Sequence, residues 1–157
     1  MSVNELDKML SNAKGKIMFV GVGSEIRGDE AGVKRIIEKI TQADISEVAA
    51  IWTDTRPENC LKNIESYNPS EVVFLLASKF GGEPGEIRVL DITDNEDSLH
   101  ESPLTTLSHY LNTQVGTKSR LVVVEPKYLK IGGVSDEMLN ASNRIGDQII
   151  STLKKHR

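Results

Sequence analysis

Residues 21–32, GVGSEIRGDEAG, follow directly on the apolar run IMFV at 17–20. The stretch holds four glycines and three acids in twelve residues. A short apolar run that ends in glycine and leads into a periodic apolar pattern is typical of a buried strand, a tight loop and a helix. Asp29 and Glu30 stand where that helix is expected to begin, so the loop also predicts a site.

Short apolar runs alternate with helical patterns along the rest of the chain. The helix after the glycine loop carries its apolar residues at i, i+3, i+4 and i+7, on one stripe. The run VVFLLA is apolar on both faces, as expected of a strand covered by helices on both sides. Strands are predicted at 16–21, 48–53, 72–77, 86–90 and 120–125, and helices at 29–42, 57–67, 103–112 and 135–155.

This alternation predicts one α/β domain over residues 1–157, a three-layer α/β/α sandwich around a mostly parallel sheet. The run EIRVL at 86–90 alternates in polarity, which indicates an edge strand. Ligands of such folds bind beyond the carboxyl ends of the strands. The groups to consider first are therefore the acids after strand one and Asp54 after strand two. Ser135 is expected to cap the last helix.

The composition narrows the class of protein. The chain has 157 residues and a net charge of −4, and no basic stripe favours nucleic acid or an anionic membrane as a partner. The single cysteine, Cys60, excludes an internal disulfide and a cysteine-rich zinc site. The polar, amphipathic N-terminus lacks the apolar core of a signal peptide. We expect a cytoplasmic domain of enzyme size.

A dinucleotide loop is one interpretation of the glycines. The fingerprint G-x-G-x-x-G needs its third glycine two residues earlier than Gly28, and Glu25 and Asp29 would repel a pyrophosphate. Asp54 could hold a ribose, which keeps this alternative open. A P-loop is excluded because no Lys-Ser or Lys-Thr follows Gly28. The structural alternative is a tight turn, with Asp29 and Glu30 as the N-terminal cap of the helix and favourable charges at its dipole.

The stretch GVGSEIRGDEAGV resembles the opening motif of the nickel-dependent hydrogenase maturation endopeptidases. The resemblance continues, in the family's order, through WTDT at Asp54, the segment PGEI at 84–87, HESPL at His100, and VEP at 124–126 with GVS at 133–135. These five pieces span nearly the whole chain. They imply the fold of that family, an α/β/α sandwich of the phosphorylase/hydrolase-like type.

The resemblance implies a function and a site. Members of the family are cytoplasmic processing proteases that remove a short C-terminal extension from the large-subunit precursor of a nickel-iron hydrogenase, after nickel insertion. Glu30 matches the first metal ligand of the family and His100 the histidine ligand, while Asp54 matches a further aspartate important for activity. Nickel would arrive with the precursor and bind the free protein weakly. We expect a monomer, although the oligomeric state stays open.

The sequence departs from the family pattern at two positions. Leu76 stands where the family has an aspartate ligand, and leucine cannot bind a metal. Ser24 replaces an asparagine of the first loop. Carboxylate and imidazole are reasonable nickel ligands, so one group of each kind could recognise a metal that the substrate already holds. The alternative is a relative that binds precursor or metal without cutting.

Several of these residues also have plain structural interpretations. His100 could be a surface histidine near a helix start, and Asp54 could simply close a turn with Thr55. Arg27 is expected to pair with Asp29 or Glu25, or to contact the substrate. Cys60 is expected to be a small buried apolar group.

Overall fold

The structure is a computed structural model that describes residues 2–91 and 103–156. In this part of the chain five strands form one sheet in the order β2-β1-β3-β5-β4. Four of them are parallel, and β4 pairs antiparallel with β5 at the edge of the sheet. The mostly parallel sheet and its edge strand confirm the predictions. The strands are β1 (Ile17–Gly21), β2 (Val48–Trp52), β3 (Glu71–Ala77), β4 (Ile87–Asp91) and β5 (Lys118–Val124).

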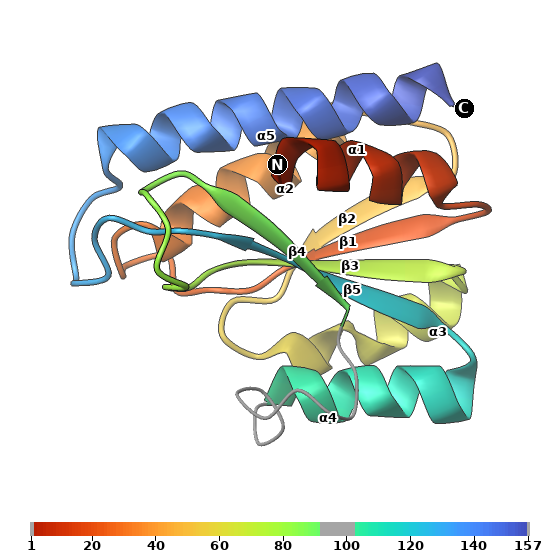
Figure 1. Cartoon of the computed structure of the whole chain (residues 1–157). Coiled ribbons are helices and arrows are strands. Elements are labelled where there is room, and N and C mark those ends of the chain that lie inside the picture. The colour runs from red at the N-terminus through yellow and green to blue at the C-terminus, as the bar shows by residue number, and fades with distance from the viewer. Residues whose placement is uncertain (1, 92–102, 157) are drawn as a thin grey trace.

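Helices cover both faces of the sheet, as Figure 1 shows. On one face lie α1 (Ser2–Asn12), α2 (Glu30–Ala43) and α5 (Asp136–Lys155). On the other lie η1 (Pro57–Cys60), α3 (Leu61–Tyr67), α4 (Pro103–Tyr110) and η2 (Leu111–Val115). The three-layer sandwich is thus confirmed. Among the described helices, none has the length and apolar character needed to cross a bilayer.

Two hydrophobic clusters, one on each face of the sheet, form the core. Successive strand residues point to opposite faces, so Phe19 packs in the α2–α5 cluster while Val20 packs in the α3–α4 cluster. All five residues of β1 are buried, which is why the run is continuously apolar. The predicted stripe of α2 is buried in the first cluster; its members are Val33, Ile36, Ile37 and Ile40.

The structure differs from the sequence prediction at three helices. Helix α1 is an addition to the prediction: Leu6, Met9 and Leu10 have helical spacing and are buried against the sheet. The predicted helix 57–67 begins as a 3-10 turn at Pro57. The predicted helix 103–112 is α-helical only as far as Tyr110, the end of α4. A π-helical turn, η2, follows it and is ended by Gly116, whose backbone is in the left-handed conformation.

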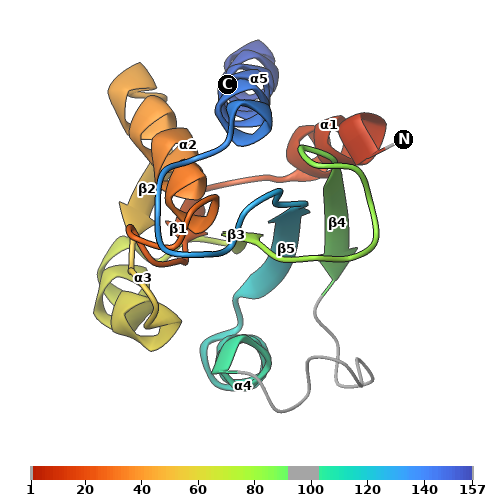
Figure 2. The same cartoon turned by 90° about the vertical axis from the view of Figure 1, so that its left-hand side faces the viewer.

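The carboxyl ends of the four parallel strands face the viewer in Figure 2. From β1 the chain crosses to β2 on one side, and the next crossover leads to β3 on the other side of β1. In folds of this kind the ligand binds in the crevice between two neighbouring strands whose crossovers leave in opposite directions. The β1–α2 loop (22–29) and the β5–α5 loop (125–135) lie side by side at this edge. The candidate site belongs here.

Candidate active site

Backbone contacts join the β1–α2 loop to the β5–α5 loop. The Asp29 amide donates to the Tyr128 carbonyl at 2.8 Å, and the Gly132 amide donates to the Ile26 carbonyl at 3.0 Å. Gly28 lies between the loops with φ +50°, and a Cβ there would come within 2.6 Å of the Tyr128 carbonyl oxygen. Only glycine fits this position, because both the conformation and the space exclude a side chain.

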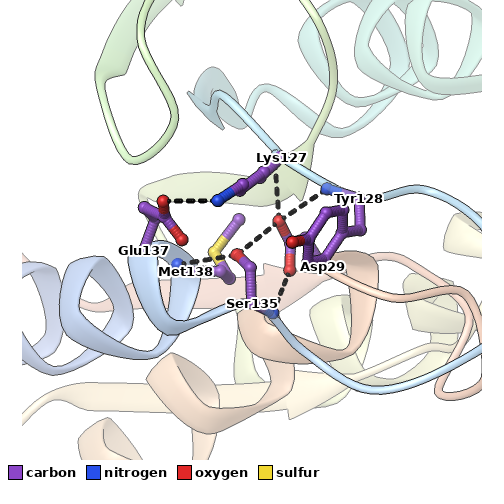
Figure 3. Close-up of polar contacts among 6 residues, drawn as sticks. All are labelled: Asp29, Lys127, Tyr128, Ser135, Glu137 and Met138. Atoms are coloured by element: carbon purple, nitrogen blue, oxygen red, sulfur yellow. Dashed lines mark hydrogen bonds and ion pairs between the residues drawn. The ribbon is translucent and has the colours of Figure 1, made fainter.

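Asp29 is completely buried and holds the β5–α5 loop through its carboxylate (Figure 3). Oδ2 accepts hydrogen bonds from the amides of Lys127 at 2.6 Å and Tyr128 at 3.0 Å. Ser135 donates its amide to Oδ1 at 2.7 Å and its hydroxyl to Oδ2 at 2.9 Å. Four donors from one distant loop therefore satisfy this buried charge, as a buried carboxylate requires.

Asp29 occupies the N-cap position of α2, as predicted, but its side chain does not cap the helix. Its backbone is already helical, with φ −70° and ψ −14°, and its carboxylate makes no cap hydrogen bond. A capping side chain needs an extended backbone to turn back on the first helical turn. Ser135 has that backbone, and its hydroxyl accepts from the Met138 amide at 3.1 Å, which confirms its predicted role as the cap of α5.

Glu30, the predicted metal ligand, lies at the first turn of α2 with its side chain 14% exposed. Its Oε1 accepts from the Ser24 amide at 2.8 Å. Its Oε2 pairs with Arg27 Nη1 at 3.0 Å. The expectation that Arg27 pairs with Asp29 or Glu25 is therefore wrong. Asp29 is enclosed by the β5–α5 loop, and Glu25 pairs instead with Lys34 at 2.7 Å.

Asp54 follows β2, and its side chain is exposed. Its φ of +53° lies in the left-handed region, which aspartate adopts more readily than most residues. Its Oδ1 accepts from Trp52 Nε1 at 3.0 Å, so the carboxylate is held beside the indole. Asp54 thus closes the turn after β2 and still presents its carboxylate at the edge of the sheet.

Gly23 brings Glu30 and Asp54 together. Its amide donates to the Asp54 carbonyl at 2.8 Å, and a Cβ at Gly23 would lie 3.1 Å from the Cβ of Glu30 and 3.3 Å from the Trp52 ring. The two predicted site residues are therefore neighbours around one glycine, although 24 positions separate them in the sequence (54 − 30).

The amides of the glycine loop bind protein oxygens. Those of Gly23, Ser24 and Asp29 donate to Asp54, Glu30 and Tyr128 respectively. A pyrophosphate cradle needs such amides turned toward the ligand. The loop therefore gives no support to the dinucleotide alternative.

Two further positions of the predicted metal site, residues 100 and 76, add no ligand in the described part of the chain. His100 lies outside the described residues. Across residues 2–91 and 103–156, no group of three His, Cys, Asp or Glu side chains is placed to hold a metal. Leu76 is half-buried at the penultimate position of β3 and packs against the α3–α4 cluster. Of the residues predicted for the site, Glu30 and Asp54 are described and carry carboxylates, each held by a neighbouring N–H group.

Glu125 is a residue that the sequence analysis does not single out as part of the site. It follows β5, is 6% exposed, and its Oε1 accepts from the amides of Phe80 at 2.9 Å and Gly82 at 3.0 Å. Its backbone carbonyl accepts from the Gly85 amide at 2.8 Å. Glu125 thereby fixes the β3–β4 loop beside the site. The signal that could have found it is an acid directly after an apolar strand.

Cys60 is fully buried at the end of η1, as predicted. Burial raises the pKa of its thiol to about 11, because the thiolate would lose its hydration. The protonated thiol is a poor nucleophile, so Cys60 is part of the core.

Comparison with known proteins shows what this chain is similar to. No family model matches the chain. A Methanocaldococcus jannaschii protein with the provisional name hydrogenase maturation protease is 23% identical, over 94% of this chain and 90% of its own length. The hydrogenase 3 maturation protease of Escherichia coli K12 is 28% identical over 60% of this chain and 64% of its own.

A solved structure of a maturation protease has the same fold as this chain. The crystal structure of the [NiFe] hydrogenase maturation protease HycI from Thermococcus kodakarensis superimposes with a TM-score of 0.85 and 26% identity, covering 96% of this chain and 99% of that one. Nearly the whole chain thus has a counterpart in that fold. The sequence resemblance, the relatives and the shared fold agree: the chain is similar in sequence and in fold to the hydrogenase maturation proteases.

Proposed function

We propose that the protein is the endopeptidase that removes the C-terminal extension of a nickel-iron hydrogenase large-subunit precursor after nickel insertion, and that it recognises the nickel in that precursor. Similarity to maturation proteases in sequence and fold supports the reaction class. The observation that supports the site is that Gly23, at the carboxyl edge of the sheet, lies against both Glu30 and the backbone of Asp54.

In this proposal the metal belongs to the substrate. A metal that arrives already held by ligands of the precursor needs few further ligands from this protein. Such a metal supplies positive charge that marks a loaded precursor and polarises a nearby carbonyl. Glu30 binds it, and His100 is proposed as the second ligand.

Arg27 explains why the free protein should bind metal weakly. Its guanidinium already neutralises one oxygen of Glu30, at 3.0 Å, and a cation at Glu30 has to displace it. Arg27 is half-exposed and also donates Nε to the Leu129 carbonyl at 3.2 Å, so it has a second partner when it leaves Glu30. A free ion gains little in this exchange, whereas a precursor brings further contacts.

Asp54 is the proposed catalytic residue. The Trp52 indole orients one oxygen of its carboxylate, and the side chain is exposed at the edge of the sheet, where a substrate can reach it. A carboxylate held in this way can accept a proton from the water that attacks the scissile carbonyl. No serine-type nucleophile is needed for this route.

Leu76 favours a second candidate, a relative that binds the precursor without cutting it. Its side chain packs against apolar neighbours at the end of β3, where the family pattern has an acid. If that acid is needed for chemistry, the chain retains recognition alone.

Purified nickel-loaded precursor, incubated with the protein and weighed by mass spectrometry, separates these candidates. The processing protease shortens the loaded precursor and leaves nickel-free precursor intact, and Asp54→Asn and His100→Ala abolish the cut. Binding of loaded precursor with no change in mass supports the second candidate.

A further inference from the structure

A cavity of about 630 Å³ opens beside the candidate site, between the start of the β3–β4 loop and the β5–α5 loop. We call it the lysine pocket. Its volume lies in the range of ligand sites in proteins. Its lining residues are Lys79, Lys127, Tyr128, Leu129, Lys130, Ile131, Gly132 and Gly133.

The lysine pocket is basic in an acidic protein. Three of its lining residues are lysines and none is acidic, although the whole chain carries a net charge of −4. Lys127 pairs with Glu137 at 2.8 Å, and this contact raises the pKa of Lys127. Among the described residues, Lys79 and Lys130 have no ion-pair partner, and both are exposed. Two ammonium groups are therefore available to meet an anionic ligand.

The walls of the lysine pocket are also apolar. Ile131 is 80% exposed and Tyr128 50%, and Ile26, 62% exposed, lies on the adjoining loop. These are three of the five large apolar side chains that are exposed in the described part of the chain. A Cβ placed on Gly132 or Gly133 would meet no atom within 4 Å, so another backbone has room to approach these two glycines.

One side chain connects the lysine pocket to Glu30. Arg27 pairs with the Glu30 carboxylate through Nη1 and donates through Nε to the carbonyl of Leu129, a lining residue. Asp29, next to Glu30, fixes the amides of Lys127 and Tyr128. A ligand in the pocket therefore lies on a loop that is anchored to the candidate site.

We propose that the lysine pocket binds an extended peptide segment of the precursor in which acidic and apolar side chains alternate. Charge complementarity favours the acids, and the exposed isoleucine and tyrosine favour the apolar residues. Single-stranded nucleic acid is disfavoured because such sites combine a long basic track with several stacking aromatics, and this lining has one tyrosine and no arginine. The proposal rests on the proposed function, since it names the part of the substrate that docks.

Fluorescence anisotropy with two labelled decapeptides tests the charge requirement on the full chain. One probe repeats Glu-Leu and the other repeats Gln-Leu. The variant Lys79→Glu/Lys130→Glu removes the two unpaired lysines. Lys62→Glu/Lys118→Glu is the matched control, because it makes the same change in net charge at exposed positions outside the lining.

We expect the Glu-Leu peptide to bind at least about tenfold more tightly than the Gln-Leu peptide. The Lys79→Glu/Lys130→Glu variant should lose at least about tenfold in affinity for the Glu-Leu peptide. The affinity of Lys79→Gln/Lys130→Gln should lie between those of this variant and the wild type. The affinity of the control variant should stay within about twofold of the wild type. Equal binding of both peptides, equal losses in variant and control, or displacement of Glu-Leu by an equimolar ten-residue oligothymidylate would overturn the proposal.

A processing assay separates this inference from the proposed function. If both hold, the Lys79→Glu/Lys130→Glu variant raises KM for the loaded precursor about tenfold and leaves kcat unchanged. A wild-type protein that binds Glu-Leu but cuts no precursor rejects the function and keeps the pocket. A variant that cuts with unchanged KM rejects the pocket and keeps the function.

Discussion

Asp29 and Ser135, 106 positions apart, share two hydrogen bonds, one from the serine amide at 2.7 Å and one from its hydroxyl at 2.9 Å. The same hydroxyl accepts from the Met138 amide, so a single pair joins the start of α2 to the start of α5. Through Lys127 and Tyr128 the pair also fixes the loop beside Glu30. We infer that Asp29 is a structural anchor of the site.

Asp29→Asn should therefore destabilise the fold by about 3 kcal/mol, because an amide offers one acceptor and turns its own donors toward amide donors. Urea unfolding measures this loss. Asp44→Asn is a matched control: Asp44 is an exposed residue at the other end of α2, in a left-handed conformation that asparagine also adopts. We expect the control to lie within about 0.5 kcal/mol of the wild type. Equal effects of the two substitutions would refute the anchor.

Glu30→Gln should reduce processing of the loaded precursor by about 100-fold, because the amide keeps the Ser24 hydrogen bond and loses the charge that binds a cation. Folding stability should change by less than about 1 kcal/mol, since the Arg27 partner is half-exposed. Glu25→Gln serves as the control in the same loop, because Glu25 pairs with Lys34 at the surface. Normal kcat and KM in Glu30→Gln would remove Glu30 from the site.

Cys60 should make stability fall with pH above about 9. Its folded pKa of about 11 exceeds the ordinary value of 9.0, so the unfolded chain loses the thiol proton first. The stabilisation is complete below the unfolded pKa and is lost as pH rises toward the folded one. The free energy of unfolding, measured at about pH 8 and about pH 10.5, should fall more for wild type than for Cys60→Ala. Identical pH slopes would contradict the raised pKa.

Leu76→Asp should strengthen binding of Ni²⁺ or Cd²⁺ to the free protein, as titration calorimetry with either ion alone can measure. The half-buried position makes the carboxyl group cost about 1–3 kcal/mol in stability. Leu76→Asn controls for this cost because it has the same shape and no charge. Unchanged metal affinity in Leu76→Asp would show that the end of β3 does not face the site.

The layers and the sheet could be predicted because each depends on local periodicity. The buried stripe of α2 and the continuously apolar β1 follow directly from residue spacing. Helix α1 escapes such a prediction because its short segment offers a weak signal, the three buried apolar side chains Leu6, Met9 and Leu10. The π-helical turn after α4, which contains the buried Leu111, has no local sequence pattern that distinguishes it from a continuing α-helix.

The site was only partly predictable. Glu30 and Asp54 were identified from their places after two strands, and the structure brings them together at Gly23. The carboxylate of Asp29 could not be assigned from local signals, because its partners come from a loop about a hundred positions away. The lysine pocket is hidden from the sequence for the same reason, since Lys79 and Lys130 become neighbours only through β3–β5 pairing.

The proposed processing reaction is tested by the intact mass of the hydrogenase large subunit, isolated from cells with and without this gene. We expect the subunit to keep its C-terminal extension only when the gene is missing, and wild-type protein to restore the shorter mass while Glu30→Gln does not. Removal of the extension in cells that lack the gene would rule out this function.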